Sequence, residues 1–95
     1  MKTIAFDVDG TLIYEAGDTP RYDVIQMFKS FELFGFTMYI WSGGGVDYAT
    51  RWAQKLGLNA IVVEKGSFTP DIAVDDIEAC KLGTVNICVG NSIVK

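Results

Sequence analysis

Short apolar runs alternate with segments of helical periodicity along this chain, and this alternation restricts the possible folds more than any other feature. Strands alternating with helices at this spacing predict an α/β domain with a parallel sheet. The chain shows no repeat, linker or low-complexity tract, which indicates that residues 1–95 form one domain. The first predicted strand begins at Thr3, and the other four span 36–41, 58–63, 72–74 and 85–89.

Two longer segments between these strands predict helices. The first would begin at Thr19, whose hydroxyl can cap a helix, with Pro20 in the first helical position. The second would be capped near Asp47. A glycine follows each segment, at Gly35 and Gly57, where a left-handed residue can close a helix.

Apolar side chains recur on one face of each helix and predict the core. The aromatic side chains of the first helix are interpreted as core residues, because they follow helical periodicity without a polar partner. A third, short helix is predicted over 77–82. The inward-facing side chains are Val24, Phe28, Phe31 and Phe34 in the first helix and Ala49, Trp52, Ala53 and Leu56 in the second.

Composition and charge exclude several classes of function. A formal net charge of −4 argues against generic nucleic-acid binding, and no apolar run approaches a membrane span or a signal peptide. The lack of histidine excludes Ser-His and Cys-His nucleophile pairs and His-ligated metals. Cys80 and Cys88 form neither a disulfide framework nor a zinc set. We interpret both as small buried side chains in a reducing, cytoplasmic compartment.

Two carboxylates one residue apart interrupt the first apolar run, in the string Asp7-Val8-Asp9-Gly10-Thr11. Side chains alternate in direction along a strand, so Asp7 and Asp9 would leave the same side of an ideal strand. Two like charges so close are costly unless a cation neutralises them or one is protonated. A turn with no further role is the alternative, because Asp, Gly and Thr are common turn residues.

Polar residues also follow two other predicted strands, in the form of Ser42 with three glycines and the pair Asp75-Asp76. Ligands of open parallel sheets bind beyond the carboxyl ends of the strands, where these residues would converge with Asp7 and Asp9. Several carboxylates without His or Cys suit a hard cation, by default Mg²⁺. The glycine turn opens a helix and could hold an anion. A cation beside an anion pocket indicates phosphoryl chemistry.

These motifs, in this order, resemble the haloacid dehalogenase superfamily of aspartyl-phosphate phosphohydrolases. The resemblance spans most of the chain, and the string from Asp7 to Thr11 is its most specific part. It implies that Asp7 is the nucleophile and that Asp9 is the general acid and base. It also implies a Mg²⁺ held by Asp7, the Asp9 backbone carbonyl and Asp76. Asp75 would support these ligands without contacting the ion itself.

The resemblance further implies that Ser42 and the Gly43 N–H hold the phosphoryl oxygens, together with a lysine. Lys65 is the candidate because it precedes the fourth strand, and a solvated loop lysine is the alternative.

The fold implied by the resemblance is a three-layer α/β/α, Rossmann-like domain with a five-stranded parallel sheet in the order 5-4-1-2-3. Residues 64–71 must then cross two strands. The crossing needs roughly 22 Å, and the segment reaches at most about 26–29 Å, which leaves no room for a helix.

No cap domain fits between Asp9 and Ser42, because a loop, a helix and a strand fill that interval. We therefore expect a capless phosphatase acting on a small phosphate monoester. A macromolecular phosphate suits an open site as well, although Glu15 and Asp18 would repel a polyanion. An exposed sheet edge could be covered in a homodimer.

The alternatives are a phosphotransferase or mutase of the same superfamily, and a non-catalytic phosphate-binding module. The remaining charged and aromatic residues are given structural roles. Arg21 and Arg51 are interpreted as solvated helix residues, and Asp47 as a helix cap or first-turn charge. Tyr14 and Tyr48 flank the site and would either contact substrate or pack in the core or rim.

Overall fold

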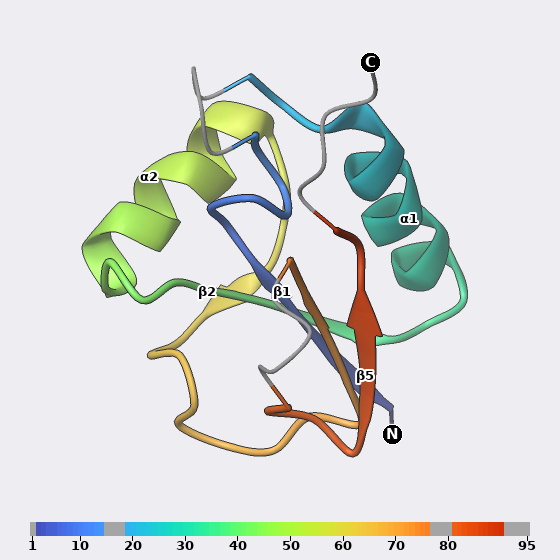
Figure 1. Cartoon of the computed structure of the whole chain (residues 1–95). Coiled ribbons are helices and arrows are strands. Elements are labelled where there is room, and N and C mark those ends of the chain that lie inside the picture. The colour runs from blue at the N-terminus through green and yellow to red at the C-terminus, as the bar shows by residue number, and fades with distance from the viewer. Residues whose placement is uncertain (1, 15–18, 77–80, 91–95) are drawn as a thin grey trace.

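The computed structural model describes residues 2–14, 19–76 and 81–90 and has the predicted α/β architecture (Figure 1). Along the chain its elements are β1 (Thr3–Asp7), α1 (Tyr22–Leu33), β2 (Thr37–Trp41), α2 (Val46–Leu56), β3 (Ile61–Val62), β4 (Ile72–Asp75) and β5 (Val85–Cys88). Among the described residues, neither helix has the length and apolar character that crossing a bilayer requires.

All strand pairs in the sheet are parallel, in the order β3-β2-β1-β4-β5. This is the predicted order read from the opposite edge, so the sheet topology is confirmed. β1 is the central strand, and its register places Asp7 opposite Trp41 of β2 and Phe6 opposite Val74 of β4. The residues that follow these strands are therefore brought to the carboxyl edge beside Asp7.

Both helices pack on the same face of the sheet. The face that presents Ile4 and Phe6 of β1 shares one core with Phe28 of α1 and Ala49 of α2. The rings of Phe6 and Phe28 lie 5.2 Å apart between centroids. The two crossovers advance along the sheet in the same direction, and right-handed crossovers then place both helices on one side.

The opposite face is covered by the segment between β3 and β4. The apolar side chains on this face are Ala5, Trp41 and Ala73, and Phe68 packs against them. The segment between β3 and β4 runs back across β2 and β1, in the direction opposite to the first two crossovers. A right-handed connection in this direction lies on the second face of the sheet. The segment contains no helix, as its short length predicts. Among the described residues, this helix-free segment covers the face on which a three-layer fold would have a helix.

The predicted short helix over 77–82 falls mainly outside the described residues, and its last two residues, Lys81 and Leu82, are not helical. Cys80 also lies outside the described residues. Cys88 is exposed on β5, so the prediction that it is buried is wrong. Among the described strands, β5 lies at the edge of the sheet.

The start of α1 differs from the prediction. The helix begins at Tyr22 after Arg21, which has an extended conformation and no side-chain cap. Two backbone bonds explain the delay, because Tyr14 N–H donates to Thr19 O at 2.7 Å and Arg21 N–H donates to Leu12 O at 2.8 Å. The residues before Tyr22 are thus committed to the loop that follows β1.

α1 ends where the sequence predicts, but not all of its aromatic side chains face the core. Gly35 follows the helix with a φ of 92°, a left-handed conformation that favours glycine. Phe28 is buried, and Phe31 packs edge-on against Phe36 at 4.9 Å. Phe34 is 76% exposed, so its assignment to the core is wrong. Phe34 is the capping residue at which the helix stops, beyond the part that packs on the sheet.

The packing of α2 follows the predicted pattern. Ala49 and Ala53 are buried, and Trp52 and Leu56 pack against the core from partly buried positions. Gly57 closes the helix in the left-handed conformation. The N-cap is Gly45, close to the predicted position, and Asp47 lies in the first helical turn, one of the two places predicted for it.

Candidate active site

The carboxyl ends of three neighbouring strands deliver the candidate site residues to one edge of the sheet. Asp7 is the last residue of β1 and Asp75 the last of β4, and Ser42 directly follows β2. Asp7, Ser42 and Asp75 are all buried, with 5%, 3% and 4% of their surfaces exposed. This convergence of polar residues is the arrangement expected from the sequence.

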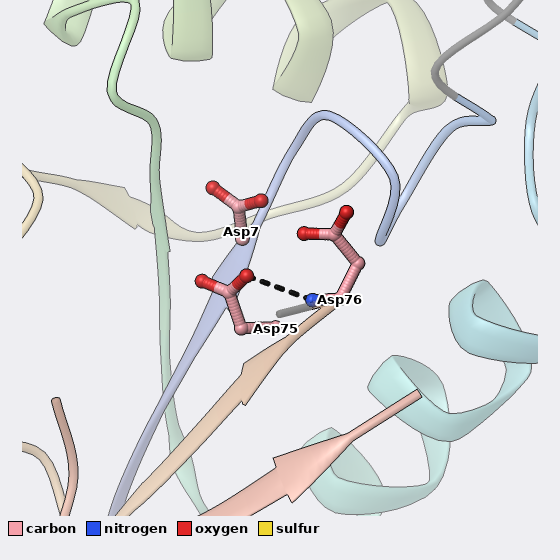
Figure 2. A group of neighbouring side chains, drawn as sticks. All are labelled: Asp7, Asp75 and Asp76. Atoms are coloured by element: carbon pink, nitrogen blue, oxygen red, sulfur yellow. Dashed lines mark hydrogen bonds between the residues drawn. The ribbon is translucent and has the colours of Figure 1, made fainter. Parts of the chain in front are cut away.

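Asp7, Asp75 and Asp76 form an acidic cluster (Figure 2). Each contributes one carboxylate oxygen, and these oxygens all lie within 4.8 Å of one another. Gly10 makes the approach of Asp76 possible, because a Cβ at Gly10 would lie 2.3 Å from Asp76 Oδ2. The cluster therefore depends on the glycine of the Asp7–Thr11 string as well as on Asp7.

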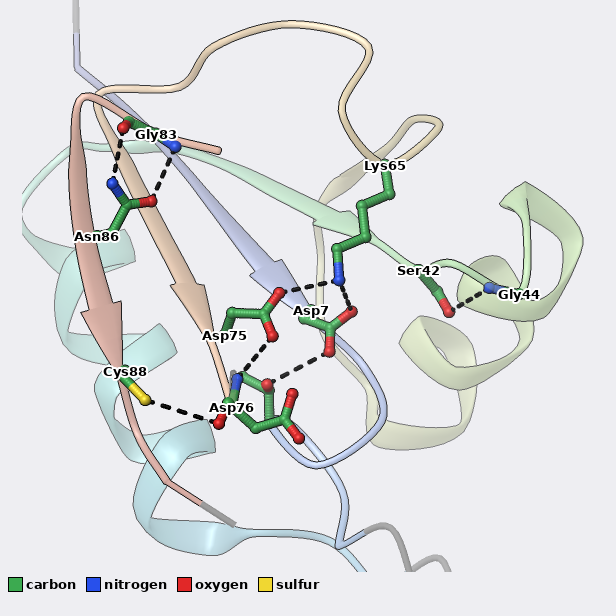
Figure 3. A network of polar contacts seen from close by, with 10 residues as sticks. Asp7, Ser42, Gly44, Lys65, Asp75, Asp76, Gly83, Asn86 and Cys88 are labelled. Atoms are coloured by element: carbon green, nitrogen blue, oxygen red, sulfur yellow. Dashed lines mark hydrogen bonds and ion pairs between the residues drawn. The ribbon is translucent and has the colours of Figure 1, made fainter. Parts of the chain in front are cut away.

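Lys65 reaches into this cluster from the segment between β3 and β4 (Figure 3). Its Nζ lies 3.0 Å from Asp7 Oδ1 and 2.9 Å from Asp75 Oδ2. Its side chain is 20% exposed, so the alternative of a solvated loop lysine is wrong.

Asp75 has both carboxylate oxygens engaged by protein groups. Oδ2 meets Lys65, and Oδ1 accepts the backbone N–H of Asp76 at 2.8 Å. Asp75 therefore holds two neighbours of the cluster in place, which suits the supporting role expected for it better than the role of a metal ligand.

Charge is poorly balanced in the cluster, since three carboxylates face one lysine. Burial, followed by repulsion from Asp75, raises the pKa of Asp7 to about 6, although Lys65 opposes this rise. Burial tends to lower the pKa of Lys65, but its hydrogen bond to Asp75 and its attraction to Asp7 raise that pKa above its ordinary value. Lys65 thus stays positively charged, and the carboxylate charge that it does not neutralise would stabilise a second cation in the cluster.

The donor set suits a hard divalent cation. All the side-chain atoms that the cluster offers are carboxylate oxygens, which hard divalent cations prefer. The room that Gly10 leaves for Asp76 is also consistent with a ligand set that includes backbone of the Asp7–Thr11 turn.

Ser42 occupies the turn between β2 and α2. Its Oγ accepts the Gly44 N–H at 2.9 Å, and its backbone carbonyl accepts the Gly45 N–H at 3.1 Å. The hydroxyl accepts a hydrogen bond there, and a serine hydroxyl is also able to donate one. Gly43 is exposed in the same turn, at the N-terminal end of α2, where backbone N–H groups and the helix dipole favour negative charge.

The Asp9 side chain is hydrogen-bonded to a residue outside the acidic cluster. Its Oδ1 accepts the hydroxyl of Tyr48 at 2.6 Å. Tyr48 comes from the first turn of α2, and sequence reasoning left its role open between substrate contact and packing. The available signal was its place shortly after the Ser42 turn, which brings the start of α2 to the same edge of the sheet as Asp9.

Sequence reasoning also placed Arg21 wrongly. It is buried rather than solvated, and its guanidinium donates to Gly10 O at 3.0 Å, to Val89 O at 3.5 Å and to Gly90 O. Arg21 thereby ties the Asp7–Thr11 turn to the end of β5. No local pattern indicates this contact, because the carbonyls come from segments distant in sequence. Arg51 is exposed, as predicted.

A hollow of about 500 Å³ lies along α2 beside Tyr48. Arg51 and Lys55 give its wall positive charge, and the Lys55 ammonium lies 4.9 Å from the centre of the Trp52 ring. Tyr48, which lines the hollow, is also the residue that contacts Asp9. Glu15 and Asp18, expected to repel polyanions, lie outside the described residues.

No family model, curated protein or solved structure matches this chain. The functional interpretation therefore depends on the side chains of the site and on their chemistry.

Proposed function

We propose that this protein is a Mg²⁺-dependent phosphohydrolase that acts on phosphate monoesters through an aspartyl-phosphate intermediate. The observation that carries the proposal is the contact of Lys65 with Asp7 at 3.0 Å, within a cluster that also holds Asp75 and Asp76. A carboxylate nucleophile, a fixed cation and a site for a metal are the parts that phosphoryl transfer requires.

Asp7 is the proposed nucleophile. One of its carboxylate oxygens forms a bond to phosphorus while the bond from phosphorus to the ester oxygen breaks, and the leaving oxygen keeps the bonding electron pair. Lys65 and the Ser42 hydroxyl, with the Gly43 N–H, stabilise the negative phosphoryl oxygens. Positioning and charge neutralisation supply most of the catalysis in reactions of this kind.

Asp9 is the proposed general acid and base. It gives a proton to the leaving oxygen in the first half-reaction and takes one from water in the second. The water oxygen then bonds to phosphorus, and the bond between phosphorus and Asp7 breaks to release phosphate. Because Asp9 is engaged by Tyr48 and not by Lys65, its carboxylate is held separately from that of Asp7.

Asp7, Asp76 and the Asp9 backbone carbonyl would hold Mg²⁺. When bound, the ion would neutralise the charge that the carboxylates and the phosphoryl group bring together. Asp75 keeps Lys65 and the backbone of Asp76 in position for this arrangement. We propose a small phosphate monoester as substrate, with its leaving group directed toward the hollow beside Tyr48.

The test is the hydrolysis of p-nitrophenyl phosphate with Mg²⁺. We expect phosphate release that EDTA abolishes and that Asp7→Asn lowers by at least about 10³-fold, because the nucleophile is lost. Asp47→Asn is the matched control, since it removes a carboxylate from the exposed first turn of α2 and should retain activity. Equal activity with and without metal, or in Asp7→Asn, would contradict the proposal.

A second variant tests the intermediate. Asp9→Asn retains the nucleophile but cannot activate water, so a phosphorylated protein should accumulate with this activated substrate and appear in intact-mass spectra. Added acceptor alcohols or sugar phosphates separate hydrolysis from transfer, because a phosphotransferase would form phosphorylated acceptor. Phosphate binding without turnover would instead support a non-catalytic module.

A further inference from the structure

Tyr48 makes a short hydrogen bond to the residue assigned the proton transfers. Its hydroxyl donates to Asp9 Oδ1 at 2.6 Å across a separation of 39 residues. The motifs that carry the proposed chemistry do not include Tyr48.

The protein holds this tyrosine firmly from two sides. Tyr48 belongs to α2, whose neighbouring residue Ala49 is fully buried against the sheet. Gly44 accommodates the ring, because a Cβ at Gly44 would lie 3.1 Å from Tyr48 Cδ2. The glycine turn that presents Ser42 thus also provides the space in which Tyr48 reaches Asp9.

We propose that Tyr48 is a positioning residue that fixes the carboxyl group of Asp9 and determines which of its oxygens transfers the proton. This role depends on the phosphohydrolase activity proposed above.

The chemistry of a carboxylic acid explains the choice of oxygen. A neutral carboxyl group accepts a hydrogen bond through its carbonyl oxygen and donates one through its hydroxyl. Because the Tyr48 hydroxyl donates to Asp9 Oδ1, we assign the proton of protonated Asp9 to the other oxygen, Oδ2.

Oδ2 therefore acts in both half-reactions. It gives its proton to the ester oxygen as the phosphorus–ester bond breaks. It then takes a proton from the water whose oxygen bonds to phosphorus, while Asp7 regains the electron pair of its bond to phosphorus. Tyr48 keeps its own proton throughout.

The test compares two substrates in wild-type protein and Tyr48→Phe. An alkyl phosphate, glycerol phosphate, has a poor leaving group that needs a well-placed acid, whereas p-nitrophenolate leaves readily without one. We expect kcat/KM to fall by about 10–100-fold with glycerol phosphate, part of what general acid catalysis supplies, and by less than about 3-fold with p-nitrophenyl phosphate. Because kcat/KM reports the first half-reaction, slow dephosphorylation cannot mask the difference.

Tyr22→Phe is the matched control, since Tyr22 is 72% exposed on α1 and should give wild-type values with both substrates. Equal losses with the two substrates, or no loss in Tyr48→Phe, would overturn the role of Tyr48 and leave the phosphohydrolase intact. An inactive wild-type protein would overturn the proposed function and this role together. Unchanged thermal unfolding of Tyr48→Phe would confirm that the fold persists.

Discussion

Arg21 is a charged residue whose burial is supported by backbone carbonyls. Its side chain is 8% exposed, and it donates to carbonyls on both sides, Gly10 in the turn after β1 and Val89 and Gly90 after β5. Asp23 lies 3.3 Å away but is largely exposed, so it adds little. The planar guanidinium suits such multiple acceptors because its donors point in several directions.

Replacing Arg21 should therefore destabilise the protein. We expect Arg21→Ala to lower the free energy of unfolding by about 2–4 kcal/mol, because one buried and two partly buried carbonyls lose a charged donor. Arg21→Lys should recover less than half of this loss, since an ammonium cannot span the same acceptors. Urea unfolding measures both, with the exposed Arg51→Ala as a control that stays within about 0.5 kcal/mol. A loss no larger than that of the control would contradict the structural role of Arg21.

At the same scale, the sequence predicts residues whose roles follow from local order and misses those that depend on distant partners. Asp7 and Ser42 could be placed because each ends or follows a strand, and parallel strands bring such positions to one edge. The contacts of Arg21 and Tyr48 could not be derived, because each joins segments whose relative placement depends on the tertiary fold.

At the scale of elements, the segment between β3 and β4 joins the fold to the candidate site. It carries Lys65 into the acidic cluster, and a few residues later it carries Phe68 onto the sheet. The Phe68 ring packs on Tyr39 and Trp41, at 4.6 Å and 5.7 Å between centroids. Phe68 therefore anchors the segment from which Lys65 projects.

Phe68→Ala should consequently affect both stability and activity. We expect a loss of about 1–2.5 kcal/mol in the free energy of unfolding, less than for a fully buried phenylalanine because Phe68 is partly exposed. A lower kcat/KM for p-nitrophenyl phosphate should accompany it, since Lys65 loses its fixed position.

The control for this prediction is Phe34→Ala. Phe34 is 76% exposed, so its removal should change stability by less than about 0.5 kcal/mol and leave activity intact. Equal effects of the two variants in urea unfolding would contradict the anchoring role of Phe68.

Element boundaries show the limit of local patterns. Gly57 closes α2 as predicted, because a left-handed glycine stop needs no distant partner. The start of α1 was predicted too early, since pairing of Thr19 and Arg21 with the loop after β1 competes with helix formation. The length of the connection over 64–71 could be derived, because strand spacing and chain reach determine it.

At the scale of the whole molecule, the acidic cluster opposes folding when no cation is bound. Burial and the charge of Asp75 raise the pKa of Asp7 to about 6, from 3.8 in the unfolded chain. Between these two values the folded state binds a proton that the unfolded state has lost, so stability falls as the pH rises through this window. Above pH 6 the loss is complete and persists.

Removing this charge should therefore stabilise the metal-free protein. In EDTA at pH 7–8, we expect Asp7→Asn to exceed wild type by up to about 3 kcal/mol in the free energy of unfolding, the equivalent of the pKa shift. The difference should vanish at about pH 3 and below, where Asp7 is protonated in both states. Mg²⁺ should raise the unfolding temperature of wild type more than that of Asp7→Asn, because the variant lacks one proposed ligand.

Urea unfolding across pH 3–8, with and without Mg²⁺, measures these effects, and Asp47→Asn should follow wild type throughout. If Asp7→Asn were less stable than wild type in EDTA at pH 7, the stabilising contact between the Asp7 carboxylate and Lys65 would outweigh the cost of burying that carboxylate beside Asp75, and the prediction would be wrong. If it were more stable, the chain would retain at the end of β1 a carboxylate that its fold resists, which is expected of a residue kept for catalysis rather than for stability.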